Sequence, residues 1–155
     1  MPARRSRSLL KPILIAGLVA GTLDILDAML FYNFRSHVPP IRILYAIASG
    51  LLGRSAFTGG LPTAALGLAM HFCIAIFWAA VFILAARVAP ALRRYAVAAG
   101  LVYGLIVYAI MNYVVLPHTH ARPLPTQASI IVLNGVGAIV FCVGLPIALI
   151  NKRFA

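Results

Sequence analysis

The sequence predicts an all-α polytopic membrane protein with four transmembrane helices and an amphipathic segment on the outer face. The chain has 155 residues, of which 63% are hydrophobic and only 10% are charged, whereas soluble domains are about 25% charged. Four apolar runs have the roughly 20 residues that a helix needs to cross about 30 Å of hydrocarbon. They cover residues 12–34, 61–86, 95–116 and 128–150 of a single membrane domain, 1–155. In lipid the backbone must satisfy its own hydrogen bonds, so each run is predicted to be helical.

The first run follows the basic sequence MPARRSR, and this combination also begins a signal peptide. A signal peptide, however, has an apolar region of about 7–15 residues and a small-residue cleavage site. The run 12–34 is longer than that and carries no clean cleavage site. We therefore expect it to remain in the membrane as the first span.

The segment between the first and second runs starts after a break at Pro39 and Pro40, because proline cannot continue a helix. Residues 41–57 read IRILYAIASGLLGRSAF, with Arg42 and Arg54 near the two ends. This segment is too short and too charged at its ends to be a span. We expect it to be an amphipathic helix that lies on the outer interface or dips into it.

Basic residues are distributed unequally around the apolar runs, and this predicts the orientation of the chain. The side that holds both termini carries Arg4, Arg5, Arg7, Lys11, Arg87, Arg93, Arg94, Lys152 and Arg153; the other side carries Arg35, Arg42, Arg54 and Arg122. The positive-inside rule places both termini in the cytoplasm. Nucleic-acid binders instead gather basic residues on a folded polar face, so the bilayer is the expected partner and nucleic acid is not. The basic tail is also expected to contact anionic headgroups.

The first and third runs share a short motif. Residues 16–21 read AGLVAG and residues 99–104 read AGLVYG. Each copy contains Gly-x-x-x-Gly, which lets two helix backbones approach closely. The glycines are Gly17, Gly21, Gly100 and Gly104. The match is either coincidence among similar membrane helices or a parallel repeat of two helix hairpins. We expect a close contact between the first and third spans, or a homo-oligomer formed through one glycine stripe.

The only two acidic residues, Asp24 and Asp27, lie within the first run, in the sequence GTLDILDAMLF. They share one side of a helix. A charged Asp at mid-membrane costs about 2.5–3.5 kcal/mol, so at least one should be protonated or paired with a cation. A rise of about 1.5 Å per residue places polar side chains of all four runs in one outer slab. This candidate polar cluster contains Asp24, Asp27, His71, Tyr108, Asn112 and Asn134.

Three interpretations fit the polar cluster. It is a structural lock that fixes helix register, a proton or cation pathway using Asp24, Asp27 and His71, or a small-molecule or lipid-headgroup site opening outward under 41–57. The sequence has no phosphate loop, no Cys-x-x-Cys and no clear nucleophile constellation. We therefore expect a non-enzymatic structural or accessory protein, with a small transporter and a membrane enzyme acting on lipid as alternatives. Any small-molecule or ion ligand stays unassigned.

Histidines in the outer loops are weak candidates for a metal site. His118 and His120 are neighbours in one short loop, and His37 lies in another. Without a thiolate or carboxylate these imidazoles do not define a metal site, so solvated loop histidines are expected. A haem in a four-helix bundle would need two buried axial histidines at matched depth. His71 has no second histidine at its depth, and Met111 is only a weak substitute. No cofactor is therefore expected.

The order of motifs resembles a known kind of protein. AGLVAG is followed by Gly67…His71-Phe72…Trp78, Ala89-Pro90, AGLVYG and the segment MNYVVLP at 111–117. This order resembles small uncharacterised four-helix inner-membrane proteins of bacteria and is distantly similar to the YagU-like family of unknown function. The sequence lacks the long outer insert of that family. The resemblance implies a bacterial inner-membrane location and supplies no catalytic residues.

Overall fold

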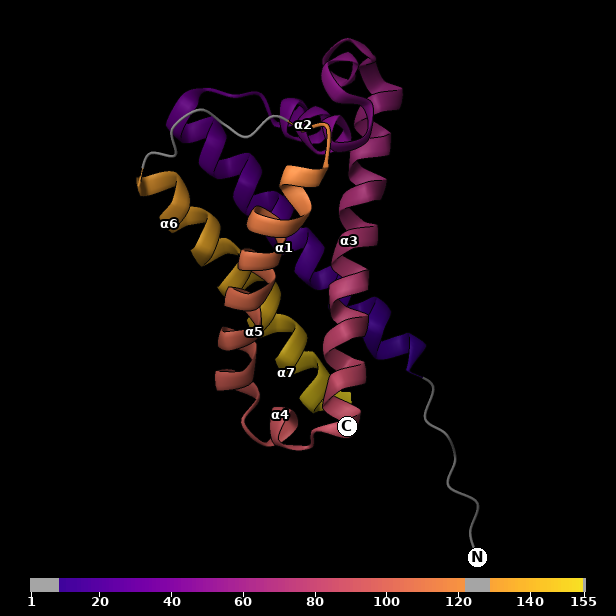
Figure 1. Ribbon diagram of the computed structural model, residues 1–155, viewed down its shortest axis with the longest axis vertical. Coiled ribbons are helices and arrows are strands. Elements are labelled where there is room, and N and C mark those ends of the chain that lie inside the picture. The colour runs from indigo at the N-terminus through magenta and orange to yellow at the C-terminus, as the bar shows by residue number, and fades with distance from the viewer. Residues whose placement is uncertain (1–8, 122–128, 155) are drawn as a thin grey trace, which may run out of the picture.

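The structure is a computed structural model that describes residues 9–121 and 129–154. Within these residues every regular element is helical, which confirms the predicted all-α class. Four helices are long and apolar enough to cross a membrane (Figure 1). They are α1 (Leu10–Ser36), α3 (Gly60–Val88), a third span Ala96–His118 and a fourth span Ser129–Phe154. The chain is therefore an all-α, multi-pass membrane protein.

The third and fourth spans each change helix type partway along. The third span consists of α5 (Ala96–Ile110), the π-helical η2 (Met111–Val115) and the 3₁₀ turn η3 (Leu116–His118). The fourth span consists of α6 (Ser129–Ala138), the π-helical η4 (Ile139–Gly144) and α7 (Leu145–Phe154). Pro117 and Pro146 lack the N–H that would bond the carbonyl four residues earlier. Those carbonyls belong to Tyr113 and Cys142, inside η2 and η4, so proline explains where regular α-helical bonding stops.

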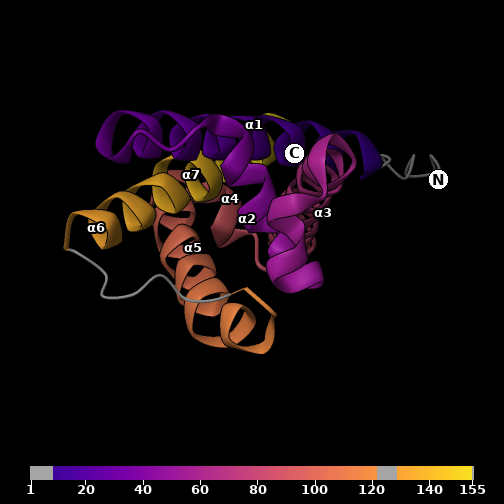
Figure 2. The same ribbon diagram turned by 90° about the horizontal axis from the view of Figure 1, so that it is seen from above.

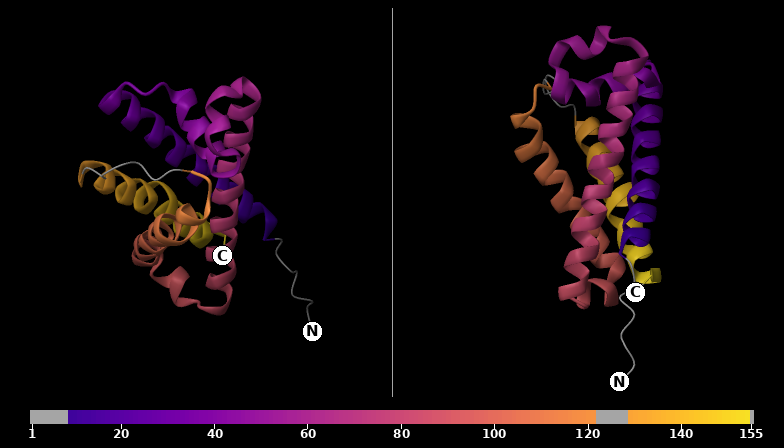
Figure 3. Two further views of the ribbon diagram at one scale, coloured as in Figure 1. Left: turned by 45° about the horizontal axis from the view of Figure 1, so that its top comes forward. Right: turned by 90° about the vertical axis from the view of Figure 1, so that its right-hand side faces the viewer.

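The predicted amphipathic segment forms α2 (Pro40–Leu52) and the 3₁₀ helix η1 (Gly53–Thr58). Gly53 and Gly60 both have φ of 62°, a conformation that glycine adopts without strain; Gly53 begins η1 and Gly60 begins α3. Figures 1 and 3 show α2 and η1 at the end of the bundle opposite the chain termini. There α2 packs on α3, where the carbonyl of Leu44 lies against Gly67. A short helix, α4 (Ala91–Arg94), connects the second and third spans at the opposite end.

Each glycine motif joins the two helices of one hairpin. In the first hairpin, Gly17 lies against the backbone of Ile76 and Gly21 lies against Phe72, all on α1 and α3. A Cβ added at Gly17 would lie 2.6 Å from the Ile76 Cα, so no larger residue fits there without movement.

The second hairpin uses its glycines in the same way. Gly100 and Gly104 of α5 lie against the backbone of Gly144 in the fourth span. The expected contact between the first and third spans is wrong, because the fourth span packs against both α1 and α5 and lies between them (Figure 2). The equivalent use of both motifs supports the interpretation of two repeated hairpins.

Apolar packing is concentrated in the half of the bundle nearest the chain termini. The buried residues of this apolar core are Ala16, Ala20, Ala79, Phe82, Ile83, Ala86, Ala96, Val143, Ile147 and Ala148. Small residues predominate on α1 and α3, which lets the helices approach closely. One end of the bundle, here called the basic end, holds the described basic residues Lys11, Arg87, Arg93, Arg94, Lys152 and Arg153. The apolar core therefore lies between the predicted polar cluster and the basic end. Arg4, Arg5, Arg7 and Arg122 lie outside the described residues.

The glycine packing predicts opposite outcomes for two substitutions on the fourth span. Gly144→Ala places a Cβ against the backbone of Gly100 and Gly104, whereas a Cβ at Gly137 meets nothing within 4 Å. We expect Gly144→Ala to lower the free energy of unfolding by about 1–3 kcal/mol and Gly137→Ala to leave it unchanged. Thermal unfolding of both variants in one detergent measures the difference. Equal stability of the two variants would contradict the packing described here.

Candidate functional site

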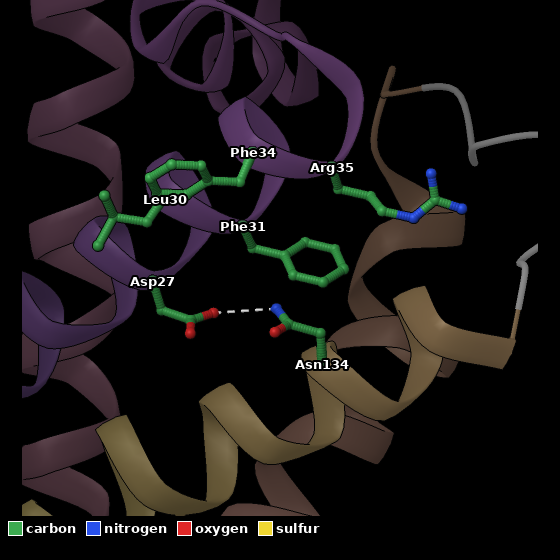
Figure 4. Close-up of a pocket in the computed structure, with 6 residues that line it drawn as sticks. All are labelled: Asp27, Leu30, Phe31, Phe34, Arg35 and Asn134. Carbon is green, nitrogen blue, oxygen red and sulfur yellow. Dashed lines mark hydrogen bonds between the residues drawn. The ribbon is translucent and has the colours of Figure 1, made fainter.

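One hydrogen bond connects the predicted polar residues of the first and fourth spans. The Asn134 Nδ2 atom donates to the Asp27 Oδ2 atom at 3.0 Å, and both residues are half-buried (Figure 4). Residues that are 107 positions apart in the chain are thereby held side chain to side chain.

A groove of about 480 Å³ opens beside this hydrogen bond. Its walls are Leu30, Phe31 and Phe34 of α1, with Asp27 and Asn134 at one end and Arg35 at the other (Figure 4). Asp27 and Arg35 are separated by about 12 Å along α1. The groove lies between α1 and α6, and no residue of α2 lines it.

His71 bonds to the backbone instead of to an aspartate. Its Nε2 atom lies 2.8 Å from the carbonyl oxygen of Gly21, and since a carbonyl only accepts, Nε2 carries the donated proton. Asp24 is close enough to His71 and Asp27 to interact with both electrostatically. Its carboxylate accepts no hydrogen bond from the described part of the chain, although it is half-buried.

The two remaining members of the predicted cluster, Tyr108 and Asn112, both lie on the third span. The Tyr108 ring packs on Gly135, and a Cβ there would lie 3.3 Å from the ring. Asn112 donates to the Tyr108 carbonyl at 3.0 Å, one turn earlier on its own helix. The structure therefore brings together Asp24, Asp27, His71 and Asn134, places Tyr108 beside them and leaves Asn112 in a bond within the third span.

Sequence reasoning missed two participants. Cys142 is close enough to Asp24 and Asp27 to interact with both. Its position about two helix turns after Asn134 was the available signal. Arg35 of α1 lines the same groove as Asp27.

The loop histidines have separate roles. His118 donates from Nδ1 to the Val114 carbonyl at 2.6 Å, and the His120 amide donates to the Gly50 carbonyl at 3.0 Å. His37 ends α1 in the left-handed conformation, with φ of 51°. Among residues 9–121 and 129–154 there is no group of three His, Cys, Asp or Glu side chains that could hold a metal ion.

The fold and the site define a multi-pass membrane protein with an intramembrane polar cluster beside a groove. No protein-family model, curated protein or solved structure matches the chain. The resemblance to bacterial four-helix inner-membrane proteins stays a prediction.

A double-mutant cycle measures the coupling free energy between Asp27 and Asn134, the bonded pair of the first and fourth spans. Asp27→Leu, Asn134→Leu and the double variant should show a favourable coupling free energy of about 0.6–1.7 kcal/mol, the range of polar contacts between membrane helices. The control cycle pairs Asp24→Leu with Asn134→Leu and should give a coupling near zero, because Asp24 accepts no bond from Asn134. Equal coupling in the two cycles would show that Asn134 does not distinguish the two aspartates.

Proposed function

We propose that this protein is a non-enzymatic structural or accessory protein of the bacterial inner membrane. The observation that carries the proposal is the bond from Asn134 to Asp27, because it connects the two hairpins. The glycine motifs hold helices together within each hairpin, whereas the polar bond joins one hairpin to the other. It fixes the position of one hairpin relative to the other, which apolar surfaces in lipid specify poorly.

Other polar groups in the membrane region also support a structural role. His71 donates to the Gly21 carbonyl, and Tyr103 donates to the Trp78 carbonyl at 2.6 Å between the third span and α3. A donor that is bonded to a backbone carbonyl gains a fixed position and satisfies its own polarity in a medium without water. Polar residues used in this way connect helices.

The apolar core argues against a pathway through the whole bundle. Ala16, Ala20, Phe82 and Ile147 belong to a buried apolar cluster between the aspartates and the basic end. A proton or cation that reached Asp24 from the outer side would meet this apolar layer before the other surface. The arrangement favours a lock over a conducting path.

The orientation in this proposal follows from charge. The described basic residues at the basic end outnumber those near α2, and the positive-inside rule then places both termini in the cytoplasm. Both glycine motifs pack inside the chain, so a homo-oligomer would need a different surface. The lipid bilayer is the proposed partner.

A proton- or cation-conducting protein is the second candidate, and one observation favours it. The Asp24 carboxylate has no hydrogen-bond donor in the described chain and lies near His71 and Asp27. Acidic and histidine side chains in membranes commonly relay protons. A lipid enzyme is less well supported, because His71, the histidine of the polar cluster, is already bonded to a backbone carbonyl.

Proteoliposomes separate the first two candidates. The structural proposal predicts that wild-type protein gives no proton or cation flux above protein-free vesicles, and that Asp24→Asn assembles normally. Flux measured with an internal pH dye or cation-sensitive dye tests this result. A flux that Asp24→Asn abolishes while the variant stays folded would replace the structural proposal with the conducting one.

A further inference from the structure

A second pocket lies at the basic end, on the opposite side of the apolar core from the polar cluster. Its volume is about 510 Å³. Lys11 of α1, Arg93 of α4 and Arg153 of α7 line it, and Arg87 of α3 contributes as well. Four separate helices thus direct basic residues to one cavity, and two of these residues, Lys11 and Arg153, come from opposite ends of the chain.

Asn151 gives this pocket a polar group that has no partner. The residue is buried, with 7% of its surface exposed, and it lines the pocket. Its Nδ2 atom is fully buried and makes no hydrogen bond. Leaving a buried donor unsatisfied costs about 1–3 kcal/mol. An acceptor that enters the pocket would remove this cost.

The basic side chains of the lining favour an anion as the acceptor that would enter the pocket. The sequence contains two acidic side chains, Asp24 and Asp27, and both lie in the polar cluster beyond the apolar core. No acidic side chain lies among the residues that line this pocket. Lysine, arginine and an amide N–H are all donors, and phosphate oxygens are the acceptors that such a set binds most strongly.

We propose that this pocket binds the phosphate of an anionic lipid headgroup. The spans α1, α3 and α7 begin or end here, which is the depth at which headgroups lie when these helices cross a membrane. The same pocket is lined by Leu9, Ile83 and Phe154, which offer apolar contact to the adjoining acyl chains. A free phosphate ion would use the charged groups alone. Basic pockets between helices are a known form of lipid-headgroup recognition.

The chain provides a matched pair of variants for the test. Arg93 and Arg153 line the pocket, whereas their neighbours Arg94 and Lys152 do not. Arg93→Gln with Arg153→Gln therefore removes the same charge as Arg94→Gln with Lys152→Gln. Full-length protein in a neutral detergent is titrated with phosphatidylglycerol, phosphatidylcholine or inorganic phosphate, and binding is followed by thermal unfolding and by native mass spectrometry.

We expect phosphatidylglycerol, and not phosphatidylcholine, to bind and to raise the melting temperature of wild-type protein. The pocket double variant should bind about twenty-five-fold more weakly, since each of the two basic contacts contributes roughly a factor of five. The control double variant should keep wild-type affinity. Equal weakening in both double variants, or equal binding of the two lipids, would overturn the proposal. Stabilisation by inorganic phosphate that competes with the lipid would assign the site to free phosphate and overturn the lipid assignment.

Asn151→Asp tests the pocket at its buried polar residue and leaves the basic side chains in place. The substitution keeps the side-chain shape and puts a carboxylate where the anion is proposed to bind. We expect the melting temperature without lipid to be maintained and the increment from phosphatidylglycerol to disappear. An unchanged lipid increment in this variant would show that the lipid does not enter the pocket.

Discussion

The constraint on which this structure depends is that apolar surface gains little when it leaves lipid for another helix. Helices in a membrane are therefore held by close backbone packing and by polar contacts. The chain meets the first requirement with glycine: Gly17 lies against Ile76, and Gly144 lies against Gly100 and Gly104. These contacts define two hairpins, and the remaining parts of the fold follow from how the hairpins are joined.

The two hairpins meet along the fourth span, which packs against α1 as well as α5. Near the basic end, the apolar core fills this interface with small and branched side chains. Farther along, where the spans separate and a groove opens, the contact is the bond from Asn134 to Asp27. The polar cluster therefore acts where apolar packing is weakest, which explains why both acidic residues of the chain occur there.

The sequence predicted the helices well because length and hydropathy determine them directly. The helices begin and end within about four residues of the predicted limits, and α2 with η1 occupies the predicted amphipathic segment. The contact between Asp27 and Asn134 followed from equal depth along antiparallel helices. Sequence alone did not reveal which way each helix turns about its own axis. Because the side that each helix turns toward its neighbours was unknown, the contact between the first and third spans was wrongly expected. For the same reason the bond of His71 to Gly21 and the position of Cys142 beside the aspartates were not predicted. The basic pocket was also hidden, because its residues come from four helices.

In the proposed lock, the Asp27–Asn134 bond fixes the outer halves of the first and fourth spans relative to each other. The direct measurement is the distance distribution between spin labels at Ser36 and Ser129, both exposed, in protein whose Cys73 and Cys142 are replaced by serine. We expect a narrow distance distribution in this background and a broader one after Asp27→Leu, whereas Asp24→Leu should leave the distribution narrow. Equal widths in the background protein and after Asp27→Leu would contradict the claim that this bond is the lock between the hairpins.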